Sequence, residues 1–150
     1  MRFHFRLEKV LELRRWEEKQ AELALAAITG ECLNLQRQIT SVKEERLSAL
    51  SRRRPQDSVT VLLSLEAYAQ RLSKLAETVQ GKLDQKLTER EGAQKKFLEA
   101  QTKRKVLDKV EEKRRLEFKK AEFQREAKRQ DDLNTAAFVR KMKAREGSGG

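Results

Sequence analysis

The chain has 150 residues and a formal net charge of +11, and Ala, Glu, Lys, Leu and Arg together make up 89 of its residues. This composition is typical of long helices and coiled coils. One Pro and six Gly provide too few turns for a β-rich fold. The single Cys excludes an intramolecular disulfide and a cysteine-rich zinc site, and it suits a reducing cytoplasm.

We expect no transmembrane helix, because the longest uncharged stretches fall far short of the roughly 20 apolar residues that a bilayer requires. We expect no secretory signal either, because the first residues lack an apolar core.

One segment interrupts the helical pattern. Residues 51–58 read Ser-Arg-Arg-Arg-Pro-Gln-Asp-Ser, and Pro55 lacks the N–H group that a helix interior needs. Asp57 or Ser58 can cap the next helix, because both side chains accept hydrogen bonds from its free N–H groups. We therefore predict one elongated unit over residues 1–146, followed by a disordered tail at 147–150. The unit comprises a helix over about 5–51, a turn at 52–57 and a helix over about 58–143.

Both predicted helices contain a heptad repeat, with seam positions at alternating steps of four and three residues. The apolar seam positions are Leu7, Leu11, Ala21, Leu25, Ile28, Cys32, Leu35, Ile39 and Val42, and then Leu65, Ala69, Leu72, Ala76, Val79, Leu83, Ala93, Phe97, Ala100 and Leu107. Charged seam positions, which cannot be dry, are Arg14, Glu18, Lys86, Arg90 and Arg104. Two heptad helices joined by a short turn are antiparallel neighbours. The predicted fold is all-α, a long antiparallel two-helix coiled coil (an αα-hairpin) with a projecting basic C-terminal helix.

The projecting segment follows from the unequal helix lengths. Folding back at Pro55 places residues 5–51 beside about 58–107, so residues 108–143 are expected to have no partner in the same chain. From Lys103 to Arg145 there are 16 Lys and Arg against 8 Asp and Glu. The same segment keeps apolar residues such as Phe123 and Phe138, which a purely solvated helix does not need. This pattern favours a docking surface for another protein.

Enzymatic chemistry is not expected, because a two-helix rod offers no pocket in which catalytic groups could converge. His4 has no second His or Cys at ligand spacing, and Gly30, Gly81 and Gly92 are isolated rather than part of a phosphate-binding loop. Cys32 falls on the first seam and is expected to be a small buried hydrophobe. We predict no cofactor and no metal.

The basic charge leaves three classes of acidic partner open: nucleic acid, an anionic membrane surface and an acidic protein patch. Acidic residues interleave with the basic ones along the C-terminal helix, which weakens its potential for nucleic acid. An interfacial membrane helix needs one continuous apolar face, and this helix has none. We therefore expect no nucleic acid and contact with a membrane only through partners, with a basic RNA-binding adaptor kept as an alternative.

The opening Phe3-x-Phe5-x-Leu7-x-x-Val10-Leu11-x-Leu13-Arg14 is not required by a heptad repeat. It resembles the N-terminal signature of the FliJ family, the small coiled-coil component of the bacterial flagellar type III export apparatus. The series Leu65-x-x-Tyr68-x-x-x-Leu72-x-x-Leu75 is similar to the start of that family's second helix. The resemblance implies a non-enzymatic central stalk and chaperone escort that supports flagellum biogenesis and motility. The equivalent stalk of a virulence secretion system is an alternative.

The resemblance also implies partners and contact residues. The stalk would insert into a hexameric export ATPase ring, contact the cytoplasmic domain of the membrane export gate and engage export chaperones. It would be cytoplasmic and recruited peripherally to the inner membrane at the flagellar base. The residues expected to contact the ATPase ring are Phe3, Phe5, Leu7, Val10, Leu11, Lys119, Lys120, Arg125 and Arg129. Those expected to contact the export gate are Gln38, Val42, Tyr68, Leu72, Leu75 and Val79.

Overall fold

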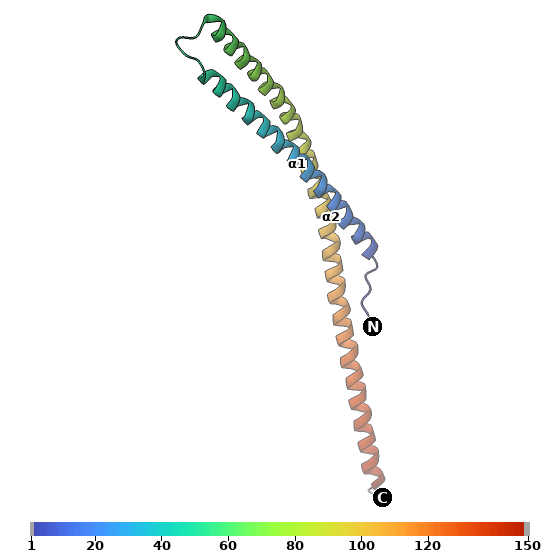
Figure 1. The fold of residues 1–150 in the computed structure, drawn as a ribbon. Coiled ribbons are helices and arrows are strands. Elements are labelled where there is room, and N and C mark those ends of the chain that lie inside the picture. The colour runs from blue at the N-terminus through green and yellow to red at the C-terminus, as the bar shows by residue number, and fades with distance from the viewer. Residues whose placement is uncertain (1, 149–150) are drawn as a thin grey trace. The chain divides into compact units, whose positions relative to one another are not determined.

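The computed structural model describes residues 2–148 and contains two helices, α1 (Glu8–Ser51) and α2 (Val59–Ser148), as Figure 1 shows. The described residues include no strand, and α1 and α2 pack against each other, which confirms the predicted all-α hairpin. Gly147 and Ser148 are the last residues of α2, and residues 149 and 150 of the expected tail lie outside the described part of the chain.

Contacts within the chain divide it into two units. The hairpin unit is Leu13–Lys103, which contains most of α1, the turn and the first half of α2. The terminal unit combines the residues up to Glu12 with those from Arg104 onward. Each unit is described by itself below.

The core of the hairpin unit is a single layer between the two helices. Cys32 and Ile39 of α1 and Val79 and Leu83 of α2 are all at least nine-tenths buried and form one cluster. These four residues are seam positions of the two heptad repeats, so burial follows the predicted period of 3.5 residues. Cys32 is 4% exposed and has no disulfide partner, which confirms its predicted role as a small buried hydrophobe.

The turn has the local structure that its residues favour. The N–H group of Arg54 donates a hydrogen bond to Oδ2 of Asp57 (2.9 Å), and the N–H group of Asp57 donates back to the carbonyl oxygen of Arg54 (3.1 Å). Ser58 then caps α2, because its Oγ accepts a hydrogen bond from the N–H group of Val61 (3.3 Å). Of the two residues predicted to cap α2, Ser58 is the cap, and Asp57 accepts a hydrogen bond within the turn instead.

The terminal unit corrects one expectation. Residues 108–143 were expected to lack a partner in the chain, but residues 2–7 pack on the first part of this range, and Phe3 contacts Phe118. Half-buried positions on α2 therefore continue to Glu122. Every described residue from Phe123 to Ser148 is exposed, so the expectation holds from Phe123 onward. The physical reason is that residues 2–5 form no helix, and a non-helical segment can reach further along α2 than a helix of equal length.

Candidate interaction surfaces

Two aromatic residues fasten the N-terminal segment to α2 in the terminal unit. The ring centroids of Phe3 and Phe118 lie 5.4 Å apart with the rings tilted by 55°, a favourable geometry for an aromatic pair. The guanidinium of Arg115 lies 5.1 Å from the centroid of the Phe3 ring, and that of Arg114 lies 5.8 Å from the centroid of the Phe5 ring. Both distances are within the range of cation–π attraction. We call these five residues the aromatic clamp.

The sequence did not reveal the aromatic clamp, although its parts were visible. The Phe3-x-Phe5 opening would place two rings on one side of an extended chain, and Phe118 lies within residues 108–143, which were expected to have no partner. Only the non-helical path of residues 2–5 brings them together, and no heptad pattern predicts that path.

The residues expected at the ATPase ring divide into buried and exposed sets. Phe5 and Leu11 are 4% and 2% exposed, and Phe3 and Leu7 are half-buried, so these four hold the N-terminal segment on α2. Val10 is exposed. Lys119, Lys120, Arg125 and Arg129 are all exposed on α2.

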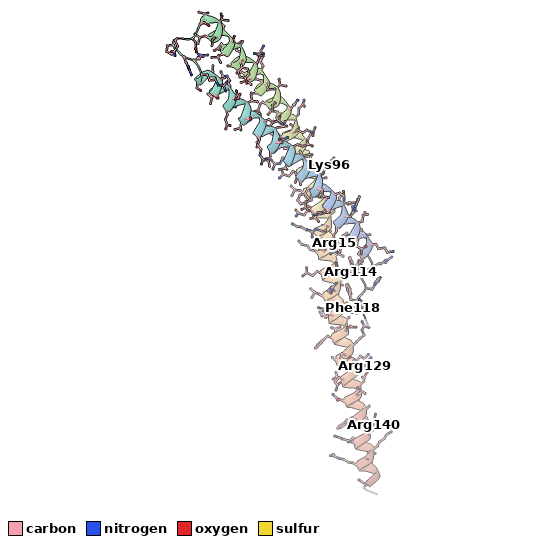
Figure 2. The ribbon with its side chains drawn as sticks, in the orientation of Figure 1. Arg15, Lys96, Arg114, Phe118, Arg129 and Arg140 are labelled. Atoms are coloured by element: carbon pink, nitrogen blue, oxygen red, sulfur yellow. The ribbon has the colours of Figure 1, made fainter. Side chains whose placement is uncertain are left out.

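Beyond the aromatic clamp, α2 carries basic residues on an unaccompanied helix. In Figure 2, Phe118 lies near the N-terminal segment, and Arg129 and Arg140 follow further along α2, where no other described segment accompanies the helix. Residues 123–148 contain seven Lys and Arg against four Asp and Glu. Phe123 and Phe138 on this stretch are 76% and 62% exposed. The stretch, which we call the basic arm, therefore offers both charge and aromatic surface to a partner.

Three of the residues expected at the export gate share one side of the hairpin unit. Gln38 and Glu45 are seven residues apart on α1, as are Tyr68 and Leu75 on α2, so each pair lies on one helix face. The hydroxyl of Tyr68 donates a hydrogen bond to Oε1 of Glu45 (3.3 Å), which places the two faces side by side. Leu75 is 48% exposed and Gln38 is exposed. We call this side, with its exposed leucine, the tyrosine side.

The other three expected gate residues lie elsewhere. Val79 is 6% exposed and belongs to the core cluster, so it is not available to a partner. Val42 and Leu72 are half-buried at the floor of a groove of about 570 Å³ between the helices. The residues lining this groove are Ile39, Val42, Lys43, Arg46, Leu47, Leu72, Ser73, Ala76, Glu77, Gln80, Gly81 and Asp84. The expected gate residues therefore do not form one continuous surface.

Lys86 is the charged seam position with the most defined environment. Its Nζ lies 2.9 Å from Oε2 of Glu31 on α1 and 3.2 Å from Oε2 of Glu89 on α2. The hydrogen bond from Lys86 to Glu31, followed by that to Glu89, raises the pKa of Lys86 above its ordinary value. Lys86 therefore remains charged at a solvated position of the seam, and its ion pair with Glu31 links α1 to α2.

The described residues contain no group of three or more His, Cys, Asp and Glu placed to hold a metal ion. Within the same range, neither helix has a stretch long and apolar enough to cross a membrane. His4 is exposed at the start of the described chain.

The comparison with known families decides the identity of this hairpin. The model of the flagellar FliJ protein matches residues 3–143, which is nearly the whole chain. The chain belongs to the FliJ family. The resemblance inferred from the N-terminal motif is thereby confirmed. No curated protein matches the chain, and no solved structure does.

As a FliJ family member, the chain is a component of the flagellar export apparatus, and the family is not one of known enzymes. The residues that carry this identity also build the fold. The N-terminal motif of the FliJ match supplies Phe3 and Phe5 to the aromatic clamp and Leu11 to the buried contact with α2.

Proposed function

We propose that the chain is the central, non-enzymatic stalk of the flagellar export ATPase and couples the ATPase ring to the export gate. In this proposal, the terminal unit inserts into the hexameric ring and promotes its assembly and ATP hydrolysis. The tyrosine side of the hairpin unit contacts the cytoplasmic domain of the gate. Export chaperones bind the same protein. The protein works in the cytoplasm, at the inner face of the inner membrane, and reaches the membrane only through these partners.

The observation that carries the proposal is the basic arm. It is a helix of 26 described residues that are all exposed, it has a surplus of basic residues, and it belongs to a FliJ family member. A stalk inside a ring needs a stiff element with surface contacts rather than deeply buried anchors, because it must rotate or tilt without adhering. Electrostatic contacts between such a basic helix and acidic loops contribute orientation and association rate more than affinity.

The aromatic clamp supports the same role. By holding residues 2–7 against α2, it thickens the base of the basic arm from one helix to a helix with an extended segment packed on it. The packed segment stiffens α2 where the basic arm begins, because bending the helix there would also break the contacts of Phe3 and Phe5 with α2.

The proposed gate contact depends on exposed residues only. Leu75, Tyr68 and Gln38 lie on the tyrosine side, and Leu75 exposes nearly half of its surface. Leu75→Glu would place a charge in the contact and is expected to weaken binding of the gate domain at least about tenfold, since interface anchors typically contribute this much. Leu63→Glu is the matched control, because Leu63 is 65% exposed on a different face of α2. Equal binding by both variants would remove the tyrosine side from the interface.

The test of the ring contact is ATP hydrolysis by the purified flagellar export ATPase with and without the full chain at physiological salt. The test variant changes Lys119, Lys120, Arg125 and Arg129 to Glu. The control variant changes four exposed lysines of the hairpin unit to Glu and alters the net charge equally; they are Lys74, Lys95, Lys96 and Lys103. We expect the control variant to stimulate hydrolysis as the wild type does, and the test variant to lose stimulation.

Two results would contradict the proposal. Unchanged stimulation by the test variant would show that these four basic residues of α2, two just before the basic arm and two within it, do not act on the ring. No stimulation by the wild type, together with its removal from the ATPase by added RNA, would instead indicate a basic coiled-coil adaptor for RNA. Binding to nucleic acid would also weaken steeply with salt, because counterions are released from the phosphates.

A further inference from the structure

An apolar stripe follows α1 on the face away from α2. Leu13, Trp16 and Leu23 expose 49%, 60% and 51% of their surface, and Ala27 and Gly30 continue the series as exposed residues. With Gln20 included, the steps between these positions alternate between three and four residues, so they form a second heptad seam. We call these six residues the outer stripe. All of them belong to the hairpin unit.

The packing of the hairpin unit does not account for the outer stripe. A tryptophan and two leucines at helical spacing on one solvent-exposed face are the usual signature of a contact surface. Gly30 ends the stripe at a position without a side chain, where a Cβ atom would meet nothing within 4 Å, as it would at Gly81 and Gly92 too. A glycine within a helix weakens it relative to alanine, and the chain's own contacts offer no compensating close approach.

The outer stripe is complementary to itself. Its large side chains, Leu13 and Trp16, occupy the first half, and its small ones, Ala27 and Gly30, occupy the second. Consider a second α1 that runs antiparallel about a twofold axis midway between residues 21 and 22. Trp16 of each copy then faces Ala27 of the other, Leu13 faces Gly30, and Gln20 faces Leu23. Alternation of large and small residues across facing positions is the condition for close packing.

The charges permit this pairing despite the strongly basic chain. Residues 13–30 contain three basic and three acidic residues, so this stretch is neutral although the whole chain carries +11. In the antiparallel register, the flanking residue Glu17 faces Ala24 of the other copy, and Lys19 faces Ala26. No like charges stand opposite each other, whereas a parallel pairing would bring Glu12 beside Glu17.

We propose that two copies of this chain associate through the outer stripe as an antiparallel, twofold-symmetric pair of α1 helices. The interface is isologous, since the same surface of each copy forms both halves. The 18 residues from Leu13 to Gly30 span only about 27 Å along a helix. The dimer is therefore weak and reversible, with dissociation in the micromolar range. Because apolar contacts form it, its affinity changes little with salt.

The test is analytical ultracentrifugation of the full chain over roughly 1–200 μM, the range in which a weak dimer dissociates. Ala27→Trp brings two tryptophans together at each end of the pairing and is expected to weaken the dimer at least about tenfold. Trp16→Ala leaves two small residues facing each other and weakens it as well. The double variant with both changes places the new alanine at position 16 opposite the new tryptophan at position 27, so each facing pair again combines one large and one small residue. We therefore expect the double variant to recover dimerisation. All these positions are exposed, and circular dichroism checks that the helices persist.

Several results would overturn the proposal. The wild type could remain monomeric over the whole range. Ala27→Trp could strengthen association, as it would for non-specific adhesion of aromatic surface. The double variant could fail to recover while its helices are intact. A monomeric wild type whose binding to a different helical protein is lost in Ala27→Trp would assign the outer stripe to that protein. None of these results bears on stimulation of the export ATPase, which is measured separately.

Discussion

Removing one buried leucine tests whether the thin core holds the hairpin unit together. Leu83 is 4% exposed and contacts the cluster that contains Cys32, Ile39 and Val79. Leu83→Ala removes three buried carbon atoms, which at about 0.8 kcal/mol each amounts to ~2.4 kcal/mol of lost transfer free energy. The additional cavity term is small, because a single layer of side chains between two helices can collapse or admit water. We therefore expect the free energy of unfolding to fall by about 2–3 kcal/mol.

The assay is urea unfolding followed by circular dichroism at neutral pH. Leu63→Ala is the control, because the same chemical change at a position 65% exposed is expected to cost under about 0.5 kcal/mol. The basic arm contributes equally to the signal of both variants, so their difference reports on the hairpin unit. A loss of under about 1 kcal/mol in Leu83→Ala, or equal losses in the two variants, would refute the idea that the seam supplies the stability of the pair.

Two further predictions concern the turn and the charged seam. Ser58→Ala removes the oxygen that accepts the hydrogen bond from the N–H group of Val61, so the free energy of unfolding is expected to fall by about 1 kcal/mol in the same urea assay. Ser58→Asp, whose side chain can also cap the helix, is expected to retain most of the wild-type stability. The pKa of Lys86 is raised in the folded state, so its ion pairs with Glu31 and Glu89 stabilise the fold fully below the ordinary lysine pKa, and this contribution disappears as pH rises through the folded pKa. Lys86→Met is therefore expected to be less sensitive than the wild type to a rise from about pH 9 to about pH 12, measured by thermal unfolding; identical pH profiles would contradict this assignment.

The hairpin could be predicted because both of its causes are local. A heptad repeat makes a helix bury one face, and Pro55 followed by two capping residues ends one helix and starts the next. Cys32 illustrates how far this reasoning extends, since its position in the repeat alone predicted its burial. The family could also be recognised from the N-terminal motif, because that motif is more specific than a coiled coil requires.

The interaction surfaces were less predictable, since a contact residue and a core residue can share the same pattern. Val79 was expected at the export gate but is buried in the core cluster, while Leu75, four residues earlier on α2, is exposed. Val42 and Leu72 line the groove between the two helices, whereas Tyr68 lies outside that groove, on the tyrosine side. A heptad position states how close a residue lies to the partner helix, but the exposed fraction depends on the size of its neighbours on both helices.

The sequence by itself determined the helices, their antiparallel pairing, the position of the turn and the family, because composition, period and capping residues act over a few neighbouring positions. Only the tertiary structure decided where the unaccompanied part of α2 begins. Residues 2–5 are not helical, and Phe3 and Phe5 reach Phe118, Arg114 and Arg115 more than a hundred positions away in the chain. The reason is that aromatic and cation–π contacts depend on the distance between the groups in space and not on their separation in the sequence. A segment without a heptad repeat has no sequence pattern that predicts where it will pack.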